Sequence, residues 1–217
     1  LILCHSDETI VHLNDTFPET QALADRIVHT GYTVKAFSRT AGERSGVIVA
    51  AGGGRVGGKL FGVAIEAKRI WKQDIGSWTL VAGPLYGDVA LERLRNQAPK
   101  GIEILGASNV LPSLYRSAAL VVSQGGYNTV CEALSQGARL TVVPYSTEKE
   151  TEQSLRAERF AALGLLTSIE EEKLNATSLV EAMQRALLRP PSDTRIDFGG
   201  AARTTQILRQ LVMERRT

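Results

Sequence analysis

Two spacings of apolar residues alternate along most of this chain. Short apolar runs end at glycine or at polar residues, and several lead into segments in which apolar residues recur every three or four positions. The first spacing is typical of buried β-strands and the second of helices that bury one face. Strands that alternate with helices favour a parallel sheet covered on both faces. The pattern therefore predicts an α/β fold with strands at residues 47–51, 78–82, 101–105, 120–123 and 140–144.

Helices are predicted from the same spacing and from capping signals. A helix after the first of these strands would bury a stripe formed by Leu60, Ala64, Ala67 and Trp71. Serine or threonine followed three residues later by glutamate is typical of a capping box. Such boxes at residues 147–150 and 178–181 predict two helix starts, and the first helix would run to about residue 163. Further predictions are a strand at residues 1–4, helices at 17–30, 112–117 and 202–215, and a linker at 33–45.

Two of the predicted strands run directly into glycines, and a helical pattern begins at once. The first unit reads VIVAAGGGRVGG and the second LVVSQGGYNTVCEAL. Glycine permits a sharp turn and a close approach to a ligand, and the helix that follows offers free N–H groups and partial positive charge. Two such helix ends facing one crevice would bind a diphosphate. A structural turn is the alternative for the first unit, which has neither the P-loop pattern nor the dinucleotide-binding one.

Charged residues near these glycines favour an anionic ligand. Arg55 and Lys59 lie near the start of the first helix, where cations oppose the helix dipole, and an anion would resolve that conflict. In the second unit Asn128 and Glu132 share a helix face. Glu132 lies roughly 9 Å along the axis from the glycines, about the span from the phosphates of a nucleotide to its ribose hydroxyls. A solvated glutamate on an amphipathic helix is the alternative.

Composition excludes several classes of protein. With 43% hydrophobic and 22% charged residues the chain is typical of soluble globular proteins, and a net charge of +2 does not favour nucleic acid. No run reaches the roughly 18 apolar residues of a membrane span. The two cysteines, Cys4 and Cys131, form no metal or redox motif, so a reducing, cytoplasmic location is expected. The chain begins at Leu1 without methionine, which leaves room for a preceding segment.

From residue 46 onward the chain resembles a known family. The stretch SQGGYNTVCEALSQGARLTVVPYSTEKETEQSLRAERFAALG is similar to the donor-binding signature of glycosyltransferase family 28 C-terminal domains. The best-known member is the bacterial N-acetylglucosaminyltransferase that completes the lipid-linked peptidoglycan precursor. The resemblance implies the GT-B fold, in which two Rossmann-like domains face each other and the C-terminal one holds the nucleotide sugar. Residues 46–217 are then the nucleotide-sugar-binding domain, and residues 1–45 are a remnant of the acceptor domain plus linker.

The resemblance also implies roles for particular residues. A diphosphate would face the first loop at Gly53, Gly54, Gly57 and Gly58, with Arg55 or Lys59 supplying charge. Ser123 precedes the second loop, and the positions expected near the phosphates are Gly125, Gly126, Asn128 and Thr129. Glu132 matches the glutamate that binds the ribose, and residues 105–111 match the segment that cups the base. Glu152 and Gln153 match a pair that contacts the sugar hydroxyls, although a first-turn acid favoured by the helix dipole is the alternative for Glu152.

The function that these roles imply is transfer of a hexosyl or N-acetylhexosaminyl group from a nucleoside-diphosphate sugar. The family favours a uridine donor and an inverting reaction. The acceptor, whether small molecule, glycan or lipid-linked, stays open. Neither a cofactor nor a metal is predicted, because the chain contains no Asp-x-Asp signature. Alternatives are a nucleotide-sugar epimerase or hydrolase, and a non-catalytic donor-binding subunit of a split glycosyltransferase.

Catalytic residues are not assigned from the sequence. In the family the acceptor site and usually the catalytic base lie in the N-terminal domain, most of which this chain is expected to lack. The fragment alone is therefore expected to be inactive, and any peripheral membrane association would run through the absent domain. The only histidines are His5, His12 and His29. An exposed or packed side chain is the favoured interpretation for His5.

Overall fold

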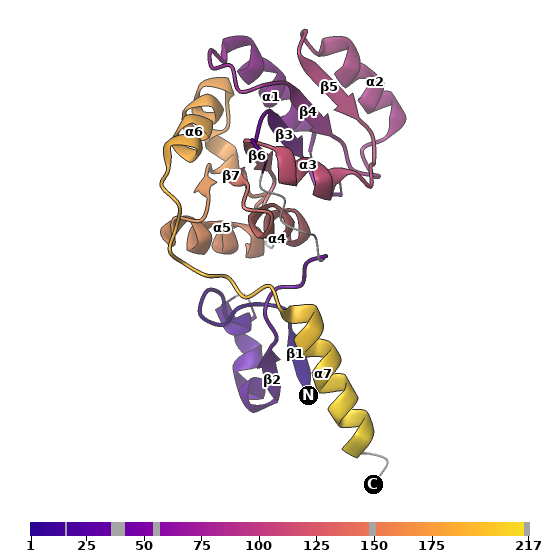
Figure 1. The fold of residues 1–217 in the computed structure, drawn as a ribbon, viewed down its shortest axis with the longest axis vertical. Coiled ribbons are helices and arrows are strands. Elements are labelled where there is room, and N and C mark those ends of the chain that lie inside the picture. The colour runs from indigo at the N-terminus through magenta and orange to yellow at the C-terminus, as the bar shows by residue number, and fades with distance from the viewer. Residues whose placement is uncertain (16, 36–41, 54–56, 148–150, 215–217) are drawn as a thin grey trace. The chain divides into compact units, whose positions relative to one another are not determined.

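The computed structural model describes residues 1–217 except 16, 36–41, 54–56, 148–150 and 215–217. The chain forms two compact units, defined here as unit 1 (residues 1–36 and 193–217) and unit 2 (residues 37–192). Figure 1 shows both units with their helices and strands labelled. The last helix of the chain therefore belongs to the same unit as its first strand. The functional division expected from the sequence, at residues 45 and 46, is a different one and stays a prediction.

Unit 2 is built on a six-stranded parallel sheet, which confirms the predicted fold class. Its strands follow the order β5-β4-β3-β6-β7-β8 across the sheet. Every residue of β3, β4 and β6 is buried, as is typical of parallel strands covered on both faces. The strand bounds are β3 (Val47–Ala50), β4 (Trp78–Val81), β5 (Ile102–Leu105), β6 (Leu120–Ser123), β7 (Arg139–Val142) and β8 (Thr167–Ser168).

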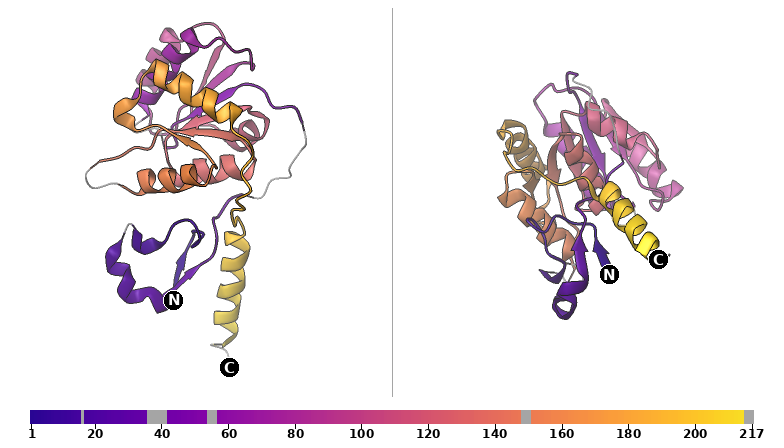
Figure 2. Two further views of the ribbon diagram at one scale, coloured as in Figure 1. Left: turned by 90° about the vertical axis from the view of Figure 1, so that its left-hand side faces the viewer. Right: turned by 60° about the horizontal axis from the view of Figure 1, so that its bottom comes forward.

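Helices cover the two faces of this sheet, as the two views of Figure 2 show. On one face α1 and α6 pack against each other, and alternate strand residues such as Val49, Trp78 and Val122 join them in one core. On the other face α4 packs against β6 and β7. The helix bounds are α1 (Gly58–Ile70), α2 (Asp88–Gln97), α3 (Leu111–Ser117), α4 (Tyr127–Ser135), α5 (Glu152–Ala162) and α6 (Ala176–Leu188), with the 3-10 turn η3 (Glu171–Lys173) before α6.

Neither α5 nor α6 begins at its predicted capping box, and residues 148–150 of the first box lie outside the described residues. α5 begins at Glu152, and its N-cap Thr151 makes no side-chain cap. The backbone N–H of Tyr145 donates to the Gln153 Oε1 (3.2 Å). At α6 a capping box does exist, but its N-cap is Asn175, and Ser178 is the third helical residue rather than the cap. The sequence prediction also missed α2 and β8.

Unit 1 consists of a two-stranded parallel sheet, short 3-10 turns and the C-terminal helix. The helix predicted at residues 17–30 is wrong, because a 3-10 segment occupies only part of this stretch and the β-branched pair Ile27 and Val28 lies in a strand beside β1. Gly31 and Gly200 allow residues 30–33 and 197–200 to touch, since a Cβ at Gly200 would lie 2.3 Å from the Gly31 carbonyl oxygen. The bounds are β1 (Ile2–Cys4), η1 (Leu13–Asp15), η2 (Pro18–Arg26), β2 (Ile27–His29) and α7 (Gly200–Glu214).

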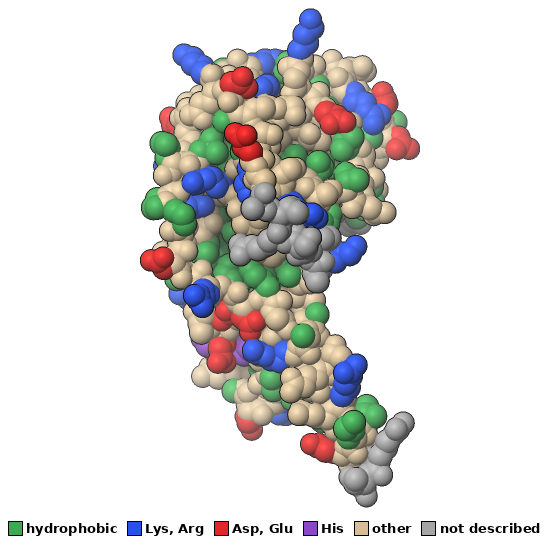
Figure 3. Space-filling model, in the orientation of Figure 1, with side chains coloured by type: hydrophobic (Ala, Val, Ile, Leu, Met, Phe, Trp, Pro, Cys, Tyr) green, Lys and Arg blue, Asp and Glu red, His purple; other side chains and the backbone are tan. Residues whose placement is uncertain are grey.

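On the molecular face drawn in Figure 3, lysine and arginine side chains are interspersed with aspartate and glutamate. Side chains of both signs thus share this face, and the net charge of the chain is +2. Among the described helices, none is both long and apolar enough to cross a membrane.

Candidate functional site

The candidate site lies where the direction of strand progression reverses. Numbered along unit 2, the strands follow the order 3-2-1-4-5-6, so the chain leaves the sheet in opposite directions from β3 and from β6. These two strands are neighbours, and their last residues, Ala50 and Ser123, are paired in register. Ligands of open α/β sheets bind beyond the carboxyl ends of the strands at such a reversal. Both glycine loops begin at this point.

The first loop passes over the carboxyl end of β3 and is held by the loop that follows β4. Gly52 has φ +55, which favours glycine. The backbone of Gly83 presses against this loop, because a Cβ at Gly83 would lie 2.1 Å from the Gly52 carbonyl oxygen. The Leu85 N–H also donates to the Gly53 carbonyl oxygen (3.0 Å). The predicted site residues Gly54 and Arg55 lie outside the described residues.

The helix that follows the first loop begins without a side-chain cap. Its N-cap, Gly57, is buried and packs so closely that a Cβ there would lie 2.3 Å from the Ala51 Cβ. Lys59, expected to help neutralise a ligand, instead donates to the Glu171 carbonyl oxygen (2.6 Å). The first-turn N–H groups of α1 are a further positive feature of this loop.

The second loop joins β6 to α4 and combines a packed glycine with an open one. A Cβ at Gly125 would lie 3.0 Å from the Gln153 Cβ, whereas a Cβ at Gly126 would meet no atom within 4 Å. Gly126 is the N-cap of α4 and provides no side-chain cap. Among the described residues, none accepts a hydrogen bond from the backbone N–H of Gly126 or of Asn128. Ser123 is fully buried, and its hydroxyl has no partner in the described part of the chain.

The two loops approach each other across the β3–β6 junction. A Cβ at Gly52 would lie 3.8 Å from the Thr129 Oγ1, which comes from the first turn of α4. Thr129 is buried, whereas Asn128 beside it is exposed. The structure therefore brings the first glycine loop to the start of α4.

The start of α5 packs against the second loop. Glu152 and Gln153 are its first two residues, and Gln153 packs on Gly125. The Glu152 side chain is 50% exposed and forms an ion pair with Arg156, which is buried. The Arg156 Nη2 donates to the Gly125 carbonyl oxygen (2.6 Å). The sequence reasoning missed Arg156, because a helix-interior arginine carries no signal until the fold places it under a glycine loop.

Glu132 lies further along α4 and is half-buried. Its charge acts on two buried neighbours. Burial raises the pKa of the Cys131 thiol to about 12, and Glu132 adds to that rise while Arg156 opposes it. Burial also raises the pKa of Tyr115, again with a smaller contribution from Glu132. The cysteine is therefore a neutral thiol at physiological pH and offers no nucleophile here.

No group of three or more metal-ligating side chains occurs among the described residues. The segment at residues 105–111, expected to cup the base, leaves the sheet at the carboxyl end of β5 and enters α3. It therefore lies on the same edge of the sheet as the two glycine loops, because all these strands are parallel.

All three histidines lie in unit 1, where His5 and His29 form side-chain hydrogen bonds. The His5 Nδ1 lies 2.8 Å from the Thr30 Oγ1, and the His29 Nδ1 lies 2.8 Å from the Ser6 Oγ. His12 and His29 line a cavity of about 230 Å³. His5 is exposed and hydrogen-bonded, as expected from the sequence.

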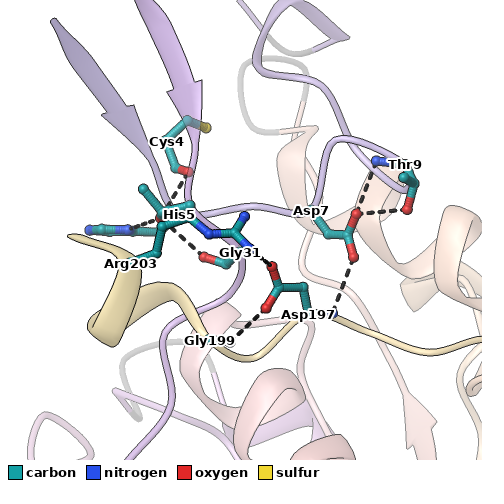
Figure 4. Close-up of polar contacts among 9 residues, drawn as sticks. Cys4, His5, Asp7, Thr9, Gly31, Asp197, Gly199 and Arg203 are labelled. Atoms are coloured by element: carbon teal, nitrogen blue, oxygen red, sulfur yellow. Dashed lines mark hydrogen bonds and ion pairs between the residues drawn. The ribbon is translucent and has the colours of Figure 1, made fainter. Parts of the chain in front are cut away.

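An aspartate pair ties the C-terminal segment into unit 1, as Figure 4 shows. The Asp7 carboxylate accepts hydrogen bonds from Thr9 and from the Asp197 N–H (3.1 Å). Asp197 in turn forms an ion pair with Arg203 of α7 (3.1 Å). Burial raises the pKa of Asp7, but these hydrogen bonds and the nearby charge of His29 outweigh it and hold the pKa below its usual value.

Comparison with known proteins gives a family and a fold. Residues 78–197, more than half of the chain, match the family model described as "Glycosyltransferase family 28 C-terminal domain". An uncharacterised glycosyltransferase of Methanopyrus kandleri is 25% identical over 163 residues, which cover 75% of this chain and 44% of that protein.

A second relative is the UDP-N-acetylglucosamine–N-acetylmuramyl-(pentapeptide) pyrophosphoryl-undecaprenol N-acetylglucosamine transferase of Shouchella clausii. It is 30% identical over 155 residues, which cover 71% of this chain and 41% of that protein. The chain thus spans less than half the length of either curated relative. Among solved structures, CalG4, the calicheamicin glycosyltransferase, superposes with a TM-score of 0.61 at 20% identity, over 98% of this chain and 48% of that one, which shows a shared fold.

Proposed function

Because this chain belongs to the glycosyltransferase family 28 C-terminal domain family, we propose that it is the donor-binding part of an inverting glycosyltransferase. Its substrate is a nucleoside-diphosphate sugar that carries a hexosyl or N-acetylhexosaminyl group. The name of the Shouchella clausii relative includes UDP-N-acetylglucosamine, which supports a uridine donor here. The acceptor is supplied elsewhere in the complete protein.

One observation carries the proposal: two glycines at the β3–β6 junction, one in each loop, leave open space beside the backbone. A Cβ at Gly53 or at Gly126 would meet no atom within 4 Å, and neither residue has a positive φ. Both glycines therefore leave room for a ligand to approach the backbone closely, and the uncapped starts of α1 and α4 favour a diphosphate there.

The remaining site residues bind the ribose and the sugar of the donor. Glu132 accepts hydrogen bonds from the ribose hydroxyls, since it lies roughly 9 Å along α4 from the glycines. Gln153 and the exposed oxygen of Glu152 contact hydroxyls of the sugar. Each hydrogen bond to a carboxylate is worth about 1.5–3 kcal/mol.

In the reaction an acceptor hydroxyl attacks the anomeric carbon, and the bond to the diphosphate oxygen breaks. The electron pair of that bond leaves with the nucleoside diphosphate, so negative charge grows between the two loops. Backbone N–H groups at the starts of α1 and α4 stabilise this charge because they are already oriented toward it. The proton of the acceptor hydroxyl passes to a base outside the donor site.

Thermal stabilisation by nucleotides tests the donor site. We expect UDP at 100 times its Kd to raise the free energy of unfolding by about 2.7 kcal/mol, and ADP, GDP and dTDP to give less. Glu132→Ala should weaken UDP binding about tenfold or more, because the ribose loses a charged acceptor. Wild type should likewise bind 2′-deoxy-UDP poorly, and the variant should no longer distinguish it from UDP. Failure of every nucleoside diphosphate to stabilise the chain contradicts the proposed function.

A further inference from the structure

Arg156 is a buried cation directly beneath the second glycine loop. It is 5% exposed, and its Nη1 is paired with Glu152 while its Nη2 donates to the Gly125 carbonyl oxygen (2.6 Å). Its guanidinium carbon lies 5.8 Å from the centre of the Tyr127 ring. The guanidinium therefore contacts α5, the loop and α4 at once.

Stability alone does not explain an arginine at this position. Its Nε–H is buried and has no hydrogen-bond partner among the described residues. A buried donor without a partner costs free energy, and so does the burial of the charge itself. An apolar side chain would fill the space without either cost.

The hydrogen bond to Gly125 fixes the direction of the next peptide N–H. In a trans peptide the C=O of one residue and the N–H of the following residue lie in one plane and point in opposite directions. Since Arg156 holds the Gly125 carbonyl toward α5, the Gly126 N–H points away from α5. This N–H has no acceptor among the described residues, and the space beside Gly126 is open.

We propose that Arg156 is a positioning residue that sets the orientation of the Gly125–Gly126 peptide, so that its N–H rather than its carbonyl oxygen faces the diphosphate of the donor. The inference rests on the proposed function, because it concerns how a peptide N–H of the same donor site is oriented. Rotation of this peptide would turn a carbonyl oxygen toward the phosphates and replace an attraction by a repulsion. Arg156 acts through the peptide and does not touch the donor.

Glu152 holds the Arg156 side chain in place. Its ion pair balances the charge of Arg156 and limits rotation of the guanidinium, while its half-exposed carboxylate faces solvent at the start of α5. The buried guanidinium thus orients the Gly125–Gly126 peptide and adds no net charge to the site.

The test compares a ligand with phosphates and one without. We expect Arg156→Met to weaken binding of UDP about tenfold or more and to leave binding of uridine within about twofold, as measured by titration calorimetry. Arg159→Met is the matched control, because Arg159 is an exposed arginine one turn further along the same helix. This control should bind both ligands as wild type does.

A measurement on wild type covers the case in which Arg156→Met does not fold. The amide proton of Gly126 should shift in NMR spectra when UDP is added and stay in place with uridine. An equal loss of UDP and uridine binding in the variant, an unchanged UDP affinity, or an unshifted Gly126 amide in the UDP-bound chain overturns the role of Arg156 alone. Wild type that binds no nucleoside diphosphate overturns the proposed function and this inference together.

Discussion

The glycines of the candidate site fall into two kinds, which the sequence does not distinguish. Gly57, Gly83 and Gly125 are packed so tightly that a Cβ would meet another atom at 3.0 Å or less, whereas Gly53 and Gly126 are open. Clusters of glycine after strands indicated the loops correctly. They could not indicate which glycines are structural, because the atoms that press on Gly83 and Gly125 come from distant segments. For the same reason neither Gly83 nor Arg156 was recognised.

Substitution of an open glycine should separate binding from folding. Gly126 has φ −58 and ψ 134, which alanine adopts readily, so Gly126→Ala should lower the free energy of unfolding by about 1 kcal/mol or less. The new methyl group would occupy the open space beside the helix start. We therefore expect UDP affinity, measured by calorimetry, to fall about tenfold or more.

Gly62→Ala is the control for that substitution, because Gly62 is an equally open glycine in the interior of α1. Alanine there should raise the free energy of unfolding by roughly 1 kcal/mol and leave UDP affinity unchanged. Wild-type UDP affinity in Gly126→Ala would show that no ligand approaches this glycine.

Among secondary-structure elements, strands were predicted more accurately than helix starts. Buried parallel strands are continuous apolar runs, and such runs mark β3, β4, β6 and β7 directly. Capping boxes depend on three or four residues, and Thr147 and Ser178 both fit the pattern although the N-caps of α5 and α6 are Thr151 and Asn175. The two-residue strand β8 has no sequence signal, since its place is set by pairing with β7. The helix starts that matter for the site, α1 and α4, were found because glycine precedes them.

For the molecule as a whole, the alternation of strands and helices predicted the sheet of unit 2, but not the composition of unit 1. Unit 1 joins the first 36 residues to the last 25, a pairing between ends of the chain that no local pattern reveals. The contacts between the two ends include the hydrogen bond from the Asp197 N–H to Asp7 and a ring contact between Tyr32 and Phe198. Asp197 also forms an ion pair with Arg203. As the pH falls, unit 1 should therefore be destabilised at a higher pH than the apolar core of unit 2.

The lowered pKa of Asp7 sets the direction of that effect. A carboxyl group whose pKa is lower in the folded state contributes stability above its unfolded pKa, and this contribution is lost as the pH falls through the folded value. We expect hydrogen exchange of the Asp197 N–H to accelerate below about pH 4 in wild type. In Asp7→Asn the rate, corrected for intrinsic pH dependence, should not change over this range, whereas Asp25→Asn, an exposed acid of the same unit, should behave as wild type. A wild-type rate that is independent of pH after this correction contradicts the role of Asp7.

The bridge between Thr33 and Gly199 has a consequence for the order in which the chain folds. While unit 2 is still a random coil, closing this bridge encloses a loop of roughly 160 residues, at an entropic cost of about 4–5 kcal/mol. Folding of the sheet first removes most of that conformational freedom, so the bridge then closes at a smaller entropic cost. The terminal helix should consequently be the last part of the chain to dock during refolding and the first to detach in denaturant.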